Sequence, residues 1–253
     1  MSLTLNLQKS TQALVLNLQK AGIMTPPVLD VAFFMDVSGS FDDEHRDGIT
    51  DSLLTRLTPW GLAFDPDKKM DVFTFSNGAA SVHEVGAINE SNYSRFVQNH
   101  IIGKVPGYNG GTAYSHLIER ALKHFGWAGD TVKKAGFFGG LMGKKDQVVQ
   151  GAKKRSLVII ATDGDNNEPG DKDRTLQVLR DSEARGDKVY YLFLGISNQG
   201  SSFPFLEKLG DKFSNTGYLN IKNLRQFVQQ SDDELNQQLL NPELLAWFSE
   251  SGK

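Results

Sequence analysis

Three polar side chains follow the most hydrophobic stretch of the chain at regular spacing. The sequence VAFFMDVSGSF at residues 31–41 places Asp36, Ser38 and Ser40 at every second position, directly after five apolar residues. One carboxylate and two hydroxyls in this pattern could bind a hard cation, because Mg²⁺ and Ca²⁺ prefer oxygen ligands. The alternative is a strand that ends in an ordinary polar turn.

Two further oxygen-bearing residues could join this set. SLVIIAT at residues 156–162 leads directly into Asp163, and Thr112 follows the glycine-rich sequence YNGG where a helix is predicted to begin, as an N-cap would. Carboxylates at the ends of neighbouring strands repel each other unless a cation or a proton lies between them. The hydroxyls of Ser38 and Ser40 favour a cation, since they supply neutral ligands.

An all-oxygen set with only two carboxylates is typical of a Mg²⁺ site, and Mn²⁺ fits equally well. The set holds no His and the chain holds no Cys, so Zn²⁺ is disfavoured. Ca²⁺ is possible in the same set. An EF-hand is not expected, because Glu168 and Arg174 stand where its loop needs Gly and a bidentate Glu.

Continuous apolar segments alternate with segments of helical pattern along the chain. Such alternation predicts an α/β fold: a three-layer, doubly wound, mainly parallel sheet with one antiparallel edge strand. Ligands bind beyond the carboxyl ends of these strands, where the five polar residues are expected. An Asn77-Gly78 hairpin should supply the antiparallel strand. The predicted central strands cover residues 28–36, 156–162 and 188–196, and helices are expected over 43–57, 113–125 and 175–187.

The order Asp36-x-Ser38-x-Ser40, then Thr112, then Asp163 in Thr-Asp-Gly resembles the metal-ion-dependent adhesion site of the von Willebrand factor A (VWA) fold. The resemblance covers about residues 26–232. The stretches TDGDNNE and YNGGTAYSHLIERAL, with the glycine-rich insert, are most similar to copine-like VWA proteins and to bacterial VWA proteins associated with tellurium resistance.

The resemblance implies a binding module rather than an enzyme, serving bacterial tellurite or chemical-stress resistance. It implies that Ser38, Ser40 and Thr112 hold the ion, that Asp36 and Asp163 hold ordered waters or the ion itself, and that an Asp or Glu of a partner protein fills the vacant position. Five nearby residues either rim the site and help to select partners or form solvated loops: Tyr108, Asn109, Asp165, Asn166 and Asn167.

A metal-assisted phosphoester hydrolase is an alternative function, because a bound ion can act as a Lewis acid. It would need a base, for which His116, one helical turn after Thr112, or Asp165 is a candidate. A helical His near a loop is more often a packing residue. The other histidines show no partner spacing: His45, His83, His100 and His124.

The insert at residues 126–155 concentrates basic charge. Seven basic and two acidic residues give it +5, which leaves −8 on the rest of a chain whose net charge is −3. Its Phe137, Phe138, Leu141 and Met142 lie between lysine pairs and could dock on an anionic membrane or a partner protein. A third hypothesis for the function is therefore a scaffold that docks on membranes through this insert. The alternative is a surface excursion whose Phe pair packs on the domain. Nucleic acid binding is not expected, since the aromatic residues are few and the pattern of no nucleic-acid-binding fold is recognised.

The N-terminal segment, residues 1–25, contains LNLQK twice, at 5–9 and 16–20. It forms either two short strands or one helix with Leu7, Leu14 and Leu18 on one face, and it either docks another protein or packs on a VWA-like domain over residues 26–253. The start lacks the pattern of a secretory signal. The longest apolar runs are far shorter than the roughly 20 residues that cross a bilayer. A cytoplasmic protein is therefore expected.

Overall fold

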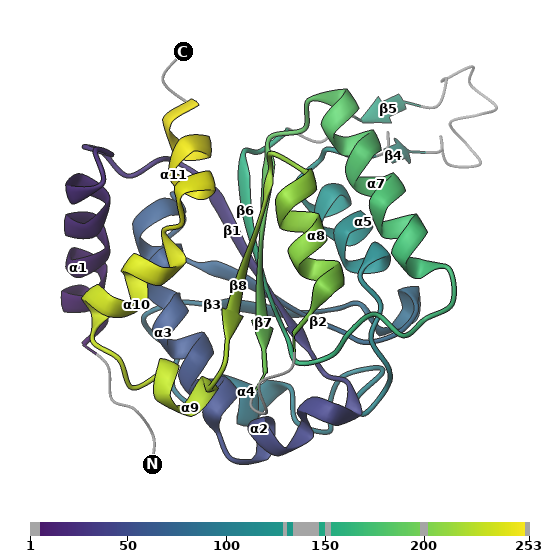
Figure 1. Cartoon of the computed structure of the whole chain (residues 1–253), viewed down its shortest axis with the longest axis horizontal. Coiled ribbons are helices and arrows are strands. Elements are labelled where there is room, and N and C mark those ends of the chain that lie inside the picture. Colours follow the sequence, from purple (N-terminus) through teal and green to yellow (C-terminus); the bar gives the residue numbers. More distant parts are fainter. Residues whose placement is uncertain (1–5, 129–130, 134–146, 150–152, 198–201, 251–253) are drawn as a thin grey trace.

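One six-stranded sheet forms the centre of the molecule in a computed structural model that describes residues 6–128, 131–133, 147–149, 153–197 and 202–250. Its strand order is β3-β2-β1-β6-β7-β8. All neighbours are parallel except β2 and β3, which confirms the predicted mainly parallel sheet with one antiparallel edge strand (Figure 1). The strands are β1 (Asp30–Asp36), β2 (Met70–Phe75), β3 (His83–Ile88), β6 (Ser156–Thr162), β7 (Val189–Ile196) and β8 (Thr216–Ile221).

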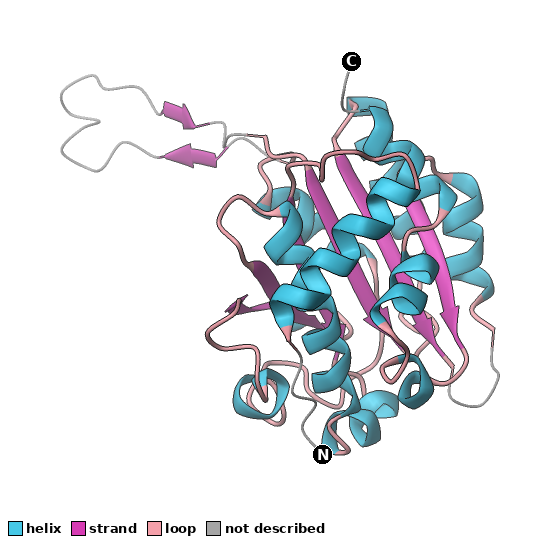
Figure 2. Ribbon diagram, turned by 90° about the vertical axis from the view of Figure 1, so that its left-hand side faces the viewer, coloured by secondary structure: helices cyan, strands magenta, loops and turns pink. Residues whose placement is uncertain are grey.

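Helices cover both faces of this sheet (Figures 1 and 2). One face carries α1 (Leu7–Lys20), α3 (Ile49–Phe64), α10 (Asp232–Leu239) and α11 (Pro242–Ser249), and the other carries α5 (Ser115–His124), α7 (Asp171–Arg185) and α8 (Pro204–Lys212). Shorter helices lie at the end toward which the parallel strands point (Figure 1): α2 (Asp42–Arg46), α4 (Phe96–His100) and α9 (Leu224–Phe227). Of the two 3₁₀ turns, η1 (Gly39–Phe41) directly precedes α2, and η2 (Ala79–Ser81) lies between β2 and β3.

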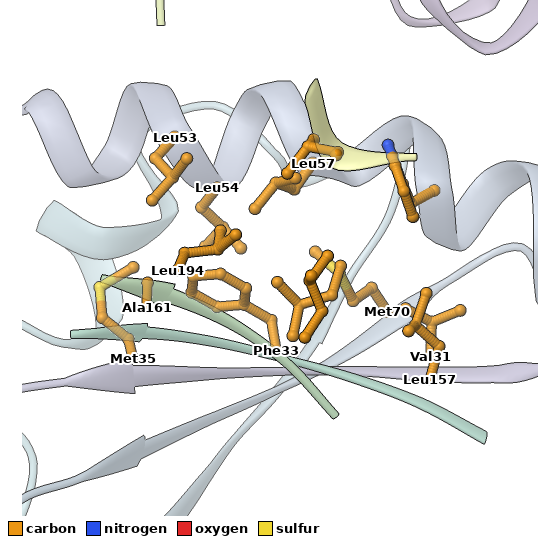
Figure 3. Close-up of a cluster of buried hydrophobic side chains, with 14 of the residues drawn as sticks. Val31, Phe33, Met35, Leu53, Leu54, Leu57, Met70, Leu157, Ala161 and Leu194 are labelled. Carbon is orange, nitrogen blue, oxygen red and sulfur yellow. The ribbon is translucent and has the colours of Figure 1, made fainter. Parts of the chain in front are cut away.

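Side chains of β1 are buried alternately against the two helical layers. Figure 3 shows one of them, in which Leu53, Leu54 and Leu57 of α3 lie over the sheet. A strand buried on both faces must be apolar at every position, which explains the continuous hydrophobic run before Asp36. The β1 residues against α3 are Val31, Phe33 and Met35, and those on the opposite face are Ala32 and Phe34.

Three local features differ from the sequence prediction. The helix expected over 43–57 is divided into α2 and α3, because Gly48 has a left-handed φ of +74° that interrupts the helical backbone. The β2–β3 pair is antiparallel as predicted, but η2 lies between the strands, so the connection is longer than a two-residue turn. Thr112 does not cap α5, whose N-cap is Tyr114.

The N-terminal segment contains one helix rather than two strands. The side chain of Asn6 caps α1, and Leu14 and Leu18 are buried in the core. Ser10 and Asn17 donate hydrogen bonds of 2.8 and 2.7 Å to the first two residues of α10, Asp232 and Asp233. The helix therefore packs on the sheet domain through both apolar and polar contacts.

The insert contains a two-stranded antiparallel hairpin, β4 (Thr131–Lys133) and β5 (Gln147–Val149), at the end of the molecule opposite α2 (Figures 1 and 2). The apolar residues between its lysine pairs lie outside the described residues. At its C-terminal end, Lys154 pairs with Asp30 at 3.0 Å and Arg155 stacks on the Trp247 ring at 3.9 Å. These two basic side chains therefore contact the folded domain. Within the described part of the chain, no helix has the length and apolarity that crossing a membrane requires.

Candidate metal centre

Three chain segments bring the five predicted residues to the carboxyl edge of the sheet. Strands β1 and β6 are parallel neighbours, with Met35 opposite Ala161, so Asp36 and Asp163 both lie at the carboxyl ends of adjacent strands. An isolated parallel bridge pairs Ser38 with Gly110, which draws in the loop that carries Thr112.

The polar atoms of these residues lie within hydrogen-bonding distance of one another. Ser40 Oγ donates to Asp163 Oδ1 at 2.9 Å, and the hydroxyls of Ser38 and Ser40 are 3.3 Å apart. Thr112 Oγ1 is 3.4 Å from Asp36 Oδ2. Three hydroxyls and two carboxylates thus lie in one cluster at this edge of the sheet, and oxygen atoms are the ligands that a hard cation prefers.

Asp36 is completely buried and held by donors from the chain around it. Its Oδ1 accepts a hydrogen bond from the backbone N–H of Ser38 at 2.8 Å, and its Oδ2 accepts one from Thr162 Oγ1 at 2.6 Å. Thr162, the last residue of β6, was not among the residues predicted from the sequence. Its only signal was a hydroxyl beside Asp163 in an otherwise apolar strand.

Electrostatics disfavour full ionisation of the two carboxylates. Burial raises the pKa of Asp36 to about 6, although hydrogen bonds from Thr162 and Ser38 oppose the shift. Burial, and then the charge of Asp36, raise the pKa of Asp163 to about 7. Among the described residues neither carboxylate forms an ion pair with Lys, Arg or His. A divalent cation between them would supply the missing positive charge.

His45 supports the end of β1 through a hydrogen bond to the backbone of Asp36. Its Nε2–H donates to the backbone carbonyl of Asp36 at 2.9 Å, and its Nδ1 is 2.8 Å from Thr50 Oγ1. Burial lowers its pKa to about 4, so the ring is neutral at physiological pH. The sequence showed no partner spacing for His45, because its partners are a carbonyl and a hydroxyl rather than a second titratable residue. His124 likewise has a partner, Asp71, at 2.9 Å.

The β6–α7 loop contributes three of the five predicted rim residues. Asp165 is exposed and pairs with Lys172 at 2.8 Å. Asn167 is also exposed, but its Oδ1 accepts a hydrogen bond from the Thr112 N–H at 3.0 Å, and its own N–H donates to the Thr112 carbonyl at 3.1 Å. Asn166 is only 6% exposed and donates to Asp171. Asn166 and Asn167 therefore support the loops, and only Asp165 presents a charge to solvent.

The other two rim residues belong to the loop before Thr112. Tyr108 is partly exposed and donates a 2.6 Å hydrogen bond to Asp42 at the start of α2. Asn109 is exposed with a left-handed φ of +64°, and its N–H donates to the Val37 carbonyl at 2.8 Å. Both residues thus fasten this loop to the segment that follows β1.

The two candidate bases have partners outside the five-residue set. His116 is buried, with its ring nitrogens 3.8 Å from Glu119 and 3.7 Å from Glu168. The carboxylate of Asp165 is engaged by Lys172. The described residues contain no group of three or more His, Cys, Asp and Glu able to hold a metal. The candidate centre is of another type, since three of its five ligands are hydroxyls.

Gly164 provides a specific test of this geometry. A Cβ at this position would lie 2.7 Å from Thr112 Oγ1 and 3.8 Å from Ser40 Oγ. We expect Gly164→Ala to displace the Thr112 hydroxyl and weaken Mg²⁺ binding about tenfold or more, the range typical for residues that orient metal ligands. Calorimetric titration with Mg²⁺ measures the effect, and circular dichroism checks that the variant is folded. Unchanged affinity in a folded variant would show that Thr112 is not a ligand.

Comparison with known proteins identifies the family. A family model described as "vWA found in TerF C terminus" matches residues 28–253. The "Uncharacterized protein YcbR" of Bacillus subtilis (strain 168) is 24% identical over 253 residues. This match covers 98% of this chain and 88% of the Bacillus protein. A solved structure, that of proximal thread matrix protein 1 from the mussel byssus, matches with a TM-score of 0.48 and 17% sequence identity. The match covers 84% of this chain and 47% of the mussel protein chain, so this chain spans about half of that protein. Because the family model covers nearly the whole chain, this protein belongs to the vWA-TerF-like family of VWA domains.

Proposed function

We propose that this VWA domain is a metal-dependent protein-binding module. The supporting observation is the pair of carboxylates, Asp36 and Asp163, whose pKa values are raised and which no basic side chain of the described residues neutralises. Each of three hydroxyls, those of Ser38, Ser40 and Thr112, lies within 3.4 Å of one of these carboxylates or of another of the hydroxyls. A structural polar turn would not need to bring a buried and a partly buried acid together.

The donor set fits Mg²⁺, with Mn²⁺ or Ca²⁺ as possible substitutes. Ser38, Ser40 and Thr112 would supply neutral oxygen ligands, and Asp36 and Asp163 would balance the charge directly or through water. When bound, the ion supplies an electrophile, and with only two carboxylates serving it the ion gains from a further anionic ligand. We propose that this ligand is an Asp or Glu of a partner protein.

The family description supports the cellular role that we propose. The matching model is described as a vWA found in the TerF C terminus, and the sequence resembles VWA proteins associated with tellurium resistance. We therefore propose that the module serves a bacterial tellurite or chemical-stress resistance system, in the cytoplasm, by joining proteins of that system. We propose no enzymatic activity, because the carboxylate of Asp165 is paired with Lys172, and the ring nitrogens of His116 lie 3.8 and 3.7 Å from the carboxylates of Glu119 and Glu168.

The ion-binding part of the proposal is tested by removing one hydroxyl. We expect Thr112→Val, which keeps the size of the side chain, to raise the Mg²⁺ dissociation constant about tenfold or more. Thr216→Val is the matched control. Thr216 is also a buried threonine, and its hydroxyl donates hydrogen bonds to the carbonyls of Leu209 and Phe213. It is the first residue of β8, so it lies at the amino end of a strand, away from the candidate centre. The control should bind Mg²⁺ like the wild type.

Calorimetry on the three folded proteins decides between two outcomes. Loss of affinity in Thr112→Val alone supports the centre. Equal affinity in all three proteins removes Thr112 from the site and, with it, the proposed adhesion-type centre.

The open coordination position is tested with acetate as a minimal carboxylate. Binding of one ligand must strengthen binding of the other by the same factor if the two contact each other favourably. We expect the wild type to bind Mg²⁺ more tightly in acetate than in chloride at equal ionic strength, after correction for acetate-bound Mg²⁺ in solution. No difference would argue against a carboxylate ligand from a partner.

A further inference from the structure

Asp171 is a buried carboxylate that lies outside the five-residue centre. It is the first residue of α7 and is only 2% exposed. Its Oδ2 accepts hydrogen bonds from the backbone N–H groups of Tyr114 and Ser115, at 2.8 and 3.2 Å, and from the side chains of Asn166 and Thr175. Its Oδ1 accepts a further hydrogen bond from Ser115 Oγ. Five donors thus converge on one carboxylate.

Most of these donors come from the two loops that carry candidate ligands. Tyr114 and Ser115 follow Thr112 by two and three residues, and Asn166 follows Asp163 by three. The loops are also joined directly by the two hydrogen bonds between Thr112 and Asn167 described above. Asp171 is therefore a further point at which the Thr112 loop is fastened to the Asp163 loop, beside the hydrogen bond from the Tyr114 hydroxyl to the Gly164 carbonyl.

Hydrogen bonding keeps this carboxylate ionised. Burial alone would raise the pKa of Asp171, but the hydrogen bonds from Ser115, Tyr114 and Asn166 outweigh it and lower the pKa below its usual value. An asparagine has the same shape but can offer only one oxygen, because its NH₂ group is a donor. In Asp171→Asn the amide oxygen can keep the donors of Oδ2, and the NH₂ group then faces Ser115 Oγ, which must change from donor to acceptor. The negative charge that strengthens all five hydrogen bonds is lost, so the links between the loops are weakened.

We infer that Asp171 is a positioning residue that fixes Thr112 relative to Asp163 and thereby sets the ion affinity of the candidate centre. The effect on ion affinity rests on the proposed function; the effect on the loops does not. Residues that orient metal ligands from outside the coordination shell typically change metal affinity by about 10- to 100-fold.

The test compares Asp171→Asn with Asp187→Asn in the full chain. Asp187 is also a buried carboxylate, 6% exposed and paired with Arg185 at 2.6 Å. It precedes β7 and so lies at the amino ends of the strands, away from the candidate centre. We expect Asp171→Asn to weaken Mg²⁺ binding about tenfold or more. We also expect it to accelerate hydrogen exchange of the Tyr114 and Ser115 amides in metal-free protein about tenfold or more. Asp187→Asn should do neither, even where it lowers the melting temperature.

Each result has one meaning. Asp171→Asn with Mg²⁺ affinity within about twofold of the wild type overturns the inference, since orienting residues change affinity more than this. If the wild type binds no Mg²⁺, the proposed function fails, and amide exchange alone decides whether Asp171 holds the loops: unchanged exchange overturns that role. If Asp171→Asn does not fold, Asn166→Ala, which removes one of the five donors, replaces it, with smaller changes expected in both measurements.

Discussion

We expect Asp163→Asn to make the metal-free protein more stable and, at the same time, to remove its response to Mg²⁺. The pKa of Asp163 is raised to about 7, so above that pH its ionisation opposes folding. After allowance for partial solvent exposure, removing the charge should stabilise the metal-free protein by on the order of 2 kcal/mol. For a domain of this size that raises the melting temperature by roughly 4–8 °C. Thermal unfolding with and without Mg²⁺ measures both effects.

Asp165→Asn is the control for this prediction. Asp165 lies two residues away and is exposed, with its charge paired by Lys172. Its replacement should change the melting temperature little and leave the Mg²⁺ response intact, because exposed ion pairs contribute little to stability. A lower melting temperature for Asp163→Asn, or a preserved response to Mg²⁺, would contradict the electrostatic account of the site.

The second large effect is a dependence of Mg²⁺ stabilisation on pH. The folded-state pKa values of Asp36 and Asp163, about 6 and about 7, lie above the ordinary value of 3.8. The folded protein therefore binds these protons more tightly than the unfolded chain, and metal-free stability falls as pH rises from about 4 to about 8. Because Mg²⁺ must displace the same protons, the increase in melting temperature that it causes should be large near pH 8 and small near pH 5.

The titration of His45 changes stability with the opposite sign, and its effect must be separated from that of the two carboxylates. Its pKa is lowered to about 4, so its contribution to stability is present above about pH 6.5 and is lost as pH falls toward 4. The contribution of His45 is the same with and without Mg²⁺ at a given pH. It therefore cancels when the two melting temperatures measured at that pH are subtracted. An increment that is the same at both pH values would show that the ion does not bind through Asp36 and Asp163.

Continuous apolar runs were sufficient to predict the central strands of the sheet. Strands buried on both faces must be apolar throughout, so the runs before Asp36 and Asp163 were recognisable, and the parallel neighbourhood of β1 and β6 followed from the fold class. The division between α2 and α3 was less visible, because Gly48 adopts its left-handed conformation in a stretch that otherwise suits a helix. The final helix α11 was missed, although Asn241 and Pro242 form an ordinary helix start.

The supporting residues of the candidate centre could not be predicted in the same way. Thr162, His45 and Asp171 act through hydrogen bonds to backbone groups or hydroxyls of distant segments. No local spacing encodes such contacts, since they depend on which loops meet at the edge of the sheet. The N-terminal helix was ambiguous for another reason: the Leu spacing of LNLQK suits both a strand and a helix, and only packing on α3 and α10 decides it.

The most direct test of the account is to locate the ion. Crystals of the protein grown with Mn²⁺, which can replace Mg²⁺ at oxygen sites and scatters anomalously, would show its position. We expect one anomalous peak among Ser38, Ser40 and Thr112, at bonding distance from at least one of their hydroxyl oxygens. A peak at another place, or none at this cluster when the crystals are saturated with Mn²⁺, would contradict the assignment of a metal centre to these residues.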